Sequence, residues 1–353
     1  MYTPLELIFR RSRHYLHSLV NENEIESEIP ISSFKVLNQP LLVRNVSIAS
    51  RILNINRIKI PSKYSTALKL IQDNFPAINV EEYDDSSGDG NGNDDKNNSN
   101  NNNNNSGNSK NKNNKSIDTS TSARSYAISI KENMDYLEIP LNSALWYLQS
   151  QKENILINPI VYPWDFHYVF QKILQDELTQ ASISPNASIS KSTIIDGPCI
   201  IEDGVTIDDF CKIKGPTYIS KGSFIGMSSL IRNCMMGNET RIGFNCEIGR
   251  SYFLGRDKIP HQNIILDSII GENVWFGAYS AIDNVLPHKQ KIMYEIDKGK
   301  SVDTGIDHFG AVIGNNCTIS TSVVVMPGRH IESDTMIQAL WKTYQISKKG
   351  STK

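Results

Sequence analysis

Histidine and cysteine are the side chains that most often bind metals or act as nucleophiles, and the chain has seven histidines and five cysteines. No pair of cysteines forms Cys-x-x-Cys, and His288, His308 and His330 show no spacing typical of zinc. We therefore expect no metal site and no disulfide, and interpret the cysteines as buried free thiols in a reducing cytosol. His261 differs from the other histidines because it lies where a repeat in the sequence is interrupted.

That repeat is a ladder of isoleucines spaced six residues apart: Ile183, Ile189, Ile195, Ile201, Ile207, Ile213, Ile219, Ile225 and Ile231. A helix repeats near 3.6 residues and a strand at 2, so a period of six predicts a parallel β-helix built from short identical rungs. Each isoleucine should fill the interior, with a small residue beside it four positions later. The cysteines all lie within the repeat region: Cys199, Cys211, Cys234, Cys246 and Cys317.

The ladder has several predicted interruptions. Its phase slips by one at Met236-Gly237, the segment Gly255–Asn263 is expected to break it, and a long excursion covers Asp283–Val312. Loops that project from a solenoid are where sites are built, so we expect His261 on such a loop. The interior residues expected beyond the slip are Ile242, Ile248, Leu254, Ile264, Ile270, Phe276, Ile282, Ile313, Ile319, Val325, Ile331 and Ile337.

Helical and strand patterns alternate in the first half of the chain, which predicts an α/β domain over residues 1–83 and 124–180. Between these parts, residues 84–123 are rich in asparagine and lack the apolar surface that a fold needs, so we expect a disordered insertion. The β-helix domain should span 181–338, followed by a polar tail at 339–353. The expected helices are 5–20, one beginning at Leu41, 65–75, 141–151 and 166–179, and the expected strands are 58–60, 78–83 and 126–130.

The bulk properties exclude several classes of partner. The formal net charge of 353 residues is −2 and the pI is about 6.4, which gives no support for a nucleic-acid or anionic-membrane partner. No run of 18 apolar residues could span a bilayer. The first residues lack the charged and apolar regions of a signal peptide, so we expect a cytoplasmic protein.

Several non-repeating segments resemble one known family. They are Ile242–Ser251, Lys258–His261, Asp267–Val274, Phe276–Ala278, Lys298–Gly305 and Phe309–Gly314. Together they resemble the acetyltransferase half of the bifunctional glucosamine-1-phosphate acetyltransferase/UDP-N-acetylglucosamine pyrophosphorylase enzymes, and the last two resemble its archaeal branch. The match covers roughly residues 183–337. It implies a left-handed β-helix, acetyl-CoA-dependent N-acetylation of a sugar phosphate, and a homotrimer with active sites between adjacent β-helices.

The resemblance also implies roles for individual residues. His261 would accept a proton from the attacking amine, which suits an imidazole near neutral pH, and Glu247 would orient it. Coenzyme contacts would fall on Gly277, Ala278 and Ser280. The implied substrate contacts are Arg232, Arg250, Lys258 and Asn284. An arginine fork suits the phosphate of such a substrate.

The sequence also departs from the family pattern. The family motif E-I-K-N-S corresponds to Glu247–Ser251 here, with glycine in place of the lysine. The motif H-L-S-Y corresponds to His261–Ile264, without the tyrosine. The motif N-I-G-A-G-T corresponds to Trp275–Ser280, with Trp in place of the asparagine and Tyr in place of a glycine. Substrate contacts are thus eroded while the acid–base pair is retained. Either the substrate has changed or catalysis is weak.

The α/β domain is similar to sugar nucleotidyltransferases at Phe34–Asn45 and Tyr162–Phe166. Their signature loop L-A-A-G-x-G-T-R is missing, and the first glycine of the chain is Gly88. A nucleoside triphosphate needs the close backbone approach that glycines permit, so we interpret this domain as a degenerate remnant with a packing, docking or regulatory role.

Three functions remain open from the sequence. The first is an acetyltransferase acting on an amino-sugar phosphate or nucleotide sugar, with acetyl-CoA as co-substrate. The second is a non-catalytic regulatory or scaffold subunit of an active sugar nucleotidyltransferase. The third is a sugar-1-phosphate nucleotidyltransferase, which the missing glycine loop disfavours.

Overall fold

The fold is taken from a computed structural model of the chain. It describes residues 6–10, 35–53, 55–62, 64–84, 125–129, 136–140, 143–147, 154–287, 290–297 and 299–339. The predicted Asn-rich insertion (84–123) and polar tail (339–353) lie outside these ranges, except for residues 84 and 339. None of the helices within them is long and apolar enough to cross a membrane.

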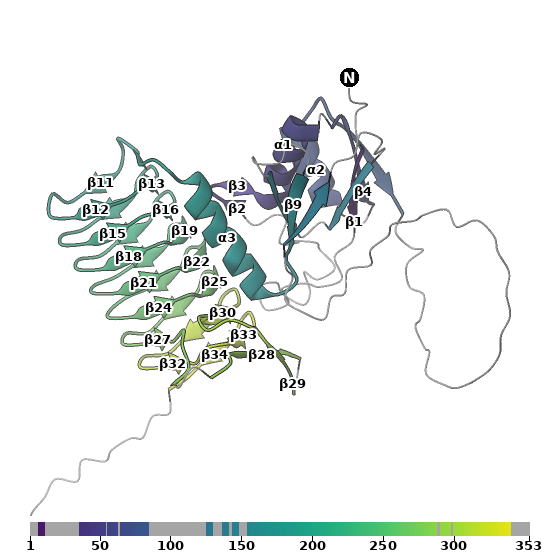
Figure 1. Cartoon of the computed structure of the whole chain (residues 1–353). Helices are drawn as coiled ribbons and strands as arrows, with labels where there is room; N and C mark the ends of the chain where they lie inside the picture. Colours follow the sequence, from purple (N-terminus) through teal and green to yellow (C-terminus); the bar gives the residue numbers. More distant parts are fainter. Residues whose placement is uncertain are drawn as a thin grey trace, which may run out of the picture.

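The second half of the chain winds into a solenoid with three parallel sheets (Figure 1). Face 1 contains β10 (Ser182–Ile183), β13 (Cys199–Ile201), β16 (Thr217–Ile219), β19 (Met235–Asn238), β22 (Tyr252–Gly255), β25 (Ile269–Glu272), β30 (Ala311–Ile313) and β33 (Arg329–Ile331). Face 2 contains β11 (Ser188–Ile189), β14 (Thr206–Ile207), β17 (Phe224–Ile225), β20 (Arg241–Ile242), β23 (Lys258–Ile259), β26 (Trp275–Phe276), β31 (Thr318–Ile319) and β34 (Met336–Ile337). Face 3 contains β12 (Ile194–Asp196), β15 (Lys212–Lys214), β18 (Leu230–Arg232), β21 (Glu247–Gly249), β24 (Ile264–Leu266), β27 (Ala281–Ile282) and β32 (Val324–Val325).

The isoleucine ladder fills the interior as predicted. Ile201, Ile207, Ile213, Ile219, Ile225 and Ile231 are all buried. Ile183 is 45% exposed because it lies in the first coil, which no other coil covers. The ladder and its stacked strands confirm the parallel β-helix, since each coil covers the strand edges of the next.

Beyond Ile231 the coils become one residue shorter and run without a break as far as Ile282. Ile231 pairs with Ile248, which pairs with Ile265. The shortening falls at the corner between faces 3 and 1, where Asn233, Arg250 and Asp267 adopt left-handed backbone angles (φ 53°, 47° and 47°). The slip at Met236-Gly237 is thus confirmed as a change of coil length.

Three predictions made from the ladder are wrong. Phe253, not Leu254, and Ile265, not Ile264, fill the interior, and Ile264 is 42% exposed. The segment Gly255–Asn263 does not break the solenoid, because β23 runs through it with Ile259 buried. The loop predicted at Gly255–Asn263 is therefore part of a regular coil.

The long excursion is confirmed. It contains an antiparallel hairpin of β28 (Met293–Asp297) and β29 (Lys300–Asp303). After it the stack resumes, since β25 pairs with β30 and β27 with β32. The hairpin lies beside the last coils (Figure 1).

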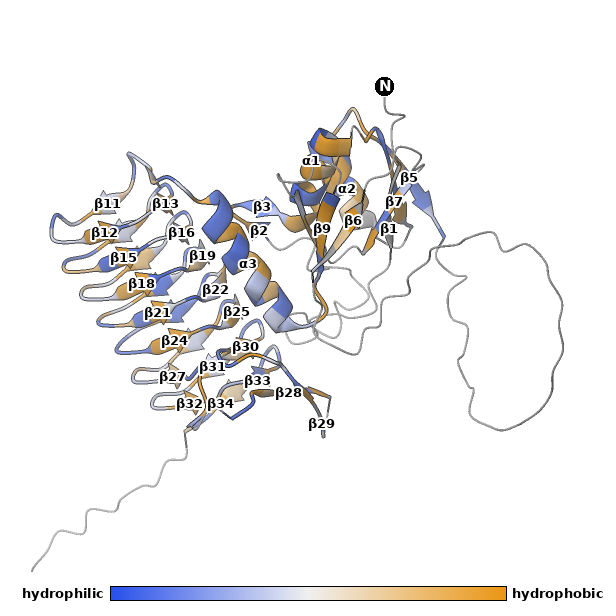
Figure 2. Cartoon of the chain, in the orientation of Figure 1, coloured by the Kyte–Doolittle hydropathy of each residue, from blue (hydrophilic) through white to orange (hydrophobic). Residues whose placement is uncertain are grey.

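The N-terminal half is an α/β fold with a parallel sheet in the order β5-β4-β1-β7. These strands are β1 (Glu6–Arg10), β4 (Arg57–Pro61), β5 (Asn79–Tyr83) and β7 (Tyr136–Pro140). An antiparallel sheet joins β6 (Tyr126–Ser129), β9 (Asn154–Pro159) and β8 (Ser143–Tyr147), and a small ladder joins β2 (Lys35–Val36) and β3 (Gln39–Pro40). The helices are α1 (Leu41–Leu53), α2 (Ser65–Asn74) and α3 (Pro163–Glu177). In Figure 2, α1, α2 and β9 carry hydrophobic stretches.

Five of the eight elements predicted for this half are confirmed directly: α1, α2, β4, β5 and β6. The helix predicted over 166–179 is also confirmed as α3, which begins at Pro163. The helix predicted over 5–20 is wrong at residues 6–10, which form β1, while residues 11–20 lie outside the described chain. The helix predicted over 141–151 is also wrong, because Leu145 pairs with Ile157 in the antiparallel sheet and both are buried.

Helix α3 joins the two halves of the molecule. It lies across face 1 of the β-helix, and Phe166 and Phe170 pack against Tyr252. The Tyr252 hydroxyl donates to the Lys35 carbonyl at 3.0 Å. The predicted fold class, an α/β domain followed by a hexapeptide-repeat β-helix, is confirmed; the exact domain boundaries stay a prediction.

Candidate functional site

His261 lies at the corner between faces 2 and 3, two residues after the end of β23. Its side chain is exposed, and its carbonyl accepts hydrogen bonds from the Tyr279 backbone at 3.0 Å and from Asn263 Nδ2 at 3.2 Å. Within the described ranges, no group hydrogen-bonds the imidazole. The coil fixes the backbone of His261 and leaves its ring free to meet a ligand.

Glu247 begins β21 on face 3 and lies in register with Ile264, three residues after His261. Its carboxylate accepts a hydrogen bond from Arg232 Nη2 at 2.6 Å. The structure therefore brings together Glu247 and Arg232, two residues predicted for different roles. The orientation of His261 by Glu247 stays a prediction.

Arg250 and Asn284, both predicted to bind substrate, instead meet at Asp267. Arg250 donates from Nε at 2.6 Å and from Nη2 at 2.5 Å to the two carboxylate oxygens of Asp267, and Asn284 Nδ2 donates at 2.5 Å. Asp267 is only 2% exposed. The arginine fork is thus already filled by a carboxylate, so a substrate phosphate would have to displace Asp267 from it.

His167 of α3 adds the N-terminal half to this cluster. Its Nε2 lies 2.7 Å from the Arg250 carbonyl oxygen, which can only accept, so Nε2 carries the proton. Burial lowers the pKa of His167, while nearby Asp267 opposes that change. Neither Asp267 nor His167 was predicted from the sequence to have a role. Arg250 and Asp267 occupy equivalent corner positions in successive coils, and this spacing was the feature of the sequence that could have predicted their contact.

The residues predicted to contact the coenzyme occupy one corner between faces 2 and 3. The Ser280 hydroxyl is buried and donates to the Ser320 carbonyl at 2.8 Å, so it is used inside the coil. Gly277 permits stacking, because a Cβ there would lie 2.2 Å from the Thr321 backbone nitrogen. Ala278 lies next to the exposed Tyr279 (61%). Of these positions, Ala278 is the one placed at the surface near His261.

Lys258 lies on face 2, in register between Arg241 and Trp275. Its side chain is exposed, and the Trp275 side chain is 42% exposed. An exposed cation beside an aromatic ring can contact an anionic or ring-shaped ligand. Its role as a substrate contact stays a prediction.

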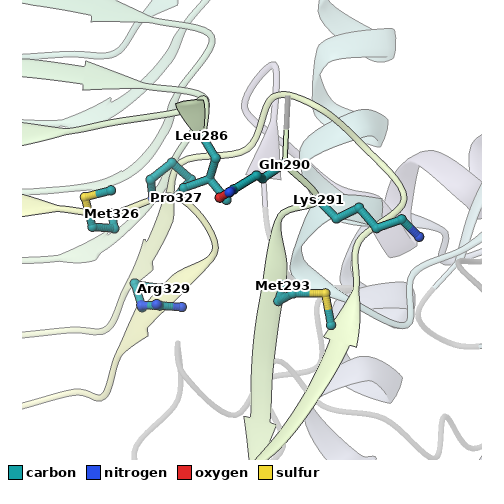
Figure 3. Close-up of a pocket in the computed structure, with 7 residues that line it drawn as sticks. All are labelled: Leu286, Gln290, Lys291, Met293, Met326, Pro327 and Arg329. Carbon is teal, nitrogen blue, oxygen red and sulfur yellow. The ribbon is translucent and has the colours of Figure 1, made fainter. Parts of the chain in front are cut away.

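A shallow cavity of about 270 Å³ lies elsewhere, between the hairpin and the last coils (Figure 3). It is lined by Leu286, Gln290, Lys291, Met293, Met326, Pro327 and Arg329. None of these residues was predicted from the sequence. Met326 and Pro327 belong to the corner between faces 3 and 1, whereas His261 lies at the corner between faces 2 and 3.

The thiol chemistry matches the prediction. All five cysteines are free and buried. Desolvation raises the pKa of Cys199 and of Cys234 to about 11, which keeps these thiols protonated and unreactive. The part of the chain that the structure describes contains no cluster of three His, Cys, Asp or Glu side chains suited to a metal ion.

Comparisons of sequence give one consistent result. Residues 178–290 match a family described as the GMPPB C-terminal domain. The bifunctional protein GlmU of Methanococcus vannielii is 35% identical over 118 residues, which cover 33% of this chain and 28% of that protein. The resemblance to the bifunctional family is confirmed. A bifunctional sugar-1-phosphate nucleotidylyltransferase/acetyltransferase of Sulfurisphaera tokodaii is 33% identical over 124 residues, covering 33% of this chain.

The match spans less than a third of these relatives, 28% of the first and 31% of the second. Among solved structures, PerB from Caulobacter crescentus in complex with CoA and GDP-perosamine has 13% identity and a TM-score of 0.26, with 45% of this chain and 60% of PerB covered. A UDP-N-acetylglucosamine acyltransferase has 17% identity and a TM-score of 0.19, with 42% and 66% covered. With TM-scores this low, neither likeness supports a function.

Proposed function

We propose that the chain is an acetyl-CoA-dependent N-acetyltransferase whose acceptor is an amino-sugar phosphate or a nucleotide sugar. The observation that carries this proposal is the 35% identity of a 118-residue segment to a bifunctional GlmU protein. A second GlmU-like relative carries acetyltransferase in its name. The exposed imidazole of His261, held on a rigid coil, is consistent with the proposal.

The proposed reaction needs one general base. His261 would take a proton from the acceptor amine as the nitrogen attacks the carbonyl carbon of the thioester. The carbon–nitrogen bond forms, the carbon–sulfur bond breaks, and the departing coenzyme A sulfur receives the proton. The base must be the neutral imidazole, since a protonated ring has no lone pair to accept the amine proton.

We also propose a homotrimer formed through the β-helices. Face 1 is covered by α3, so faces 2 and 3 and the corner between them are the surfaces open to another copy. That corner exposes apolar side chains above and below His261: Phe210 (67%), Met227 (38%), Phe244 (45%) and Tyr279 (61%). An exposed apolar row of this kind is typical of an interaction surface. Light scattering of the purified chain tests it, with Phe244→Glu expected to lower the mass.

The activity is tested by thioester cleavage with acetyl-CoA and glucosamine-1-phosphate or a nucleotide amino sugar. We expect turnover by the wild type and a loss of about 10²- to 10⁴-fold in His261→Ala. His308→Ala removes another exposed histidine and should keep the full rate. No cleavage with any amino sugar would refute the acetyltransferase proposal, and full activity of His261→Ala would refute the assignment of the base.

One observation favours a second candidate, a non-catalytic subunit that partners an active sugar nucleotidyltransferase. The α/β half is packed onto the β-helix through α3, yet it lacks the glycine-rich loop in its sequence. A domain kept for docking would have these properties. Co-purification with a sugar nucleotidyltransferase, together with absent thioester cleavage, is the result expected for this candidate.

A further inference from the structure

Face 2 of the β-helix carries a column of aromatic and cationic side chains on its outer surface. Its members are in register on the neighbouring strands β17, β20, β23 and β26, and we call them the face 2 column: Phe224, Arg241, Lys258 and Trp275. Each of them points outward, because the residue that follows it in the chain is buried in the core. The column therefore presents two cations between two aromatic rings.

The two cations of the column lie side by side without a carboxylate between them. Arg241 and Lys258 are both exposed, and neighbouring strands are about 4.8 Å apart. Among the residues that the structure describes, no carboxylate forms an ion pair with either cation or lies in register with it. Like charges on adjacent strands repel each other and destabilise a sheet. The column thus retains a repulsion that a bound anion would relieve.

An aromatic ring lies at each end of the cationic pair. Arg241 Cζ lies 5.0 Å from the centroid of the Phe224 ring, a cation–π contact that holds the guanidinium at the surface. At the other end, the Trp275 side chain is 42% exposed beside Lys258. An exposed indole on a regular strand offers a flat face on which another ring can stack. The column therefore suits a ligand that combines a planar ring with an anionic group.

The surface between the column and His261 is open. Lys258 and His261 belong to the same coil and are three residues apart, which is at most about 10 Å of extended chain. Only the Pro260 ring lies between them on the surface, because Ile259 points into the core. In the coils on either side, Gly243 and Gly277 take the place of Pro260 and have no side chain. A ligand held by the column can therefore extend to the imidazole with no long side chain between.

We infer that the face 2 column binds a nucleoside diphosphate group of the acceptor, which is then a nucleotide sugar rather than a sugar phosphate. The inference rests on the proposed function and names the class of acceptor. Arg241 and Lys258 donate to oxygens of the diphosphate, and the nucleobase stacks on Trp275. The amino sugar then extends along the coil toward His261. A sugar phosphate has no planar ring and would leave the exposed indole without a partner.

Calorimetric titration of the full chain tests the column without requiring turnover. UDP, GDP and inorganic pyrophosphate are titrated into the wild type, Arg241→Ala, Lys258→Ala and Trp275→Leu. We expect Arg241→Ala and Lys258→Ala to bind both the nucleotide and pyrophosphate about ten- to a hundredfold more weakly, because charge-assisted hydrogen bonds are lost. Trp275→Leu should weaken the nucleotide about five- to a hundredfold and leave pyrophosphate unchanged, because only the stacking is lost. Equal binding of UDP and GDP by all four proteins would overturn the inference.

Two controls separate binding from a structural role. Arg256→Ala removes an exposed arginine and its ion pair with Glu272 (2.9 Å) outside the column, and it should bind every ligand as the wild type does. The urea midpoint of Lys258→Ala should equal or exceed that of the wild type, because the repulsion from Arg241 is relieved. An equal loss of binding in Arg256→Ala, or a lower urea midpoint in Lys258→Ala, would overturn the column as a binding site.

Coenzyme A also carries a nucleoside diphosphate, so its titration identifies the source of the group. The column variants should bind coenzyme A as tightly as the wild type does, and an equal loss for coenzyme A would overturn the assignment to the acceptor. Acetyl transfer to glucosamine-1-phosphate without any binding of UDP or GDP would overturn this inference and leave the proposed function standing. If UDP or GDP binds through the column and no amino sugar is acetylated, the proposed function fails while the nucleotide site stands.

Discussion

Replacing Asp267 by alanine should weaken the joint between α3 and the β-helix. The buried carboxylate accepts hydrogen bonds from Arg250 at 2.6 and 2.5 Å and from Asn284 at 2.5 Å. It also lies 3.8 Å from His167 Nε2. The substitution leaves a guanidinium and an amide without their buried acceptor beside the helix.

The magnitude follows from the burial of the two partners. Removing one partner of a buried ion pair costs about 3–5 kcal/mol. Asp267 is buried, but the Arg250 side chain is 33% exposed, so water can solvate part of its charge. We therefore expect Asp267→Ala to lower the free energy of unfolding by about 2–4 kcal/mol. Asp267→Asn keeps one acceptor oxygen and should lose less.

Urea denaturation followed by circular dichroism measures this loss. The control is Asp303→Ala, which removes a carboxylate paired with Lys291 at 2.5 Å on the hairpin surface. Because the Lys291 side chain is 78% exposed, the control should leave the urea midpoint where it is in the wild type. If Asp267→Ala loses no more than this control, the cluster does not hold the joint together.

Three other substitutions test the interior and the joint. Burial raises the pKa of Asp257, so stability should fall as pH rises from its unfolded-state pKa through its folded one. Asp257→Asn should therefore flatten the fall of the urea midpoint above about pH 4, and an unchanged slope would contradict this. Gly243→Ala puts a Cβ 1.6 Å from the Pro260 carbonyl oxygen and should cost about 3 kcal/mol by urea titration, whereas an unchanged midpoint would refute this close stacking of coils. Tyr252→Phe removes the hydrogen bond to Lys35 and should cost about 1 kcal/mol in the same titration; no loss would mean that water replaces it.

The period of the sequence predicted the β-helix because an apolar side chain, most often isoleucine, recurs at the interior positions. It misplaced the later rungs because counting by six cannot distinguish a projecting loop from a corner that lost one residue. Leu254 and Ile264 kept the expected spacing by chance, whereas Phe253 and Ile265 fill the core. The physical constraint is that a side chain must point inward, and the corner geometry sets that direction.

The candidate site was only partly accessible to sequence reasoning. The resemblance makes His261 a candidate, but the partners of Glu247 and Arg250 depend on which residues lie side by side in successive coils. Arg232 pairs with Glu247 because their strands are adjacent, although the residues are distant along the chain. In the N-terminal half, residues 143–147 form a strand because pairing with β9 outweighs their local helical pattern.

The contact between α3 and face 1 has a practical consequence for dissecting the molecule. Tyr218, Met235, Tyr252, Ile269 and Val312 all point outward from face 1 and are buried under the helix and its neighbours. A β-helix expressed alone from residue 181 would present this row of side chains to water and should aggregate. Fragments designed to isolate the β-helix should therefore begin before Pro163 and keep α3 as the cover of that surface.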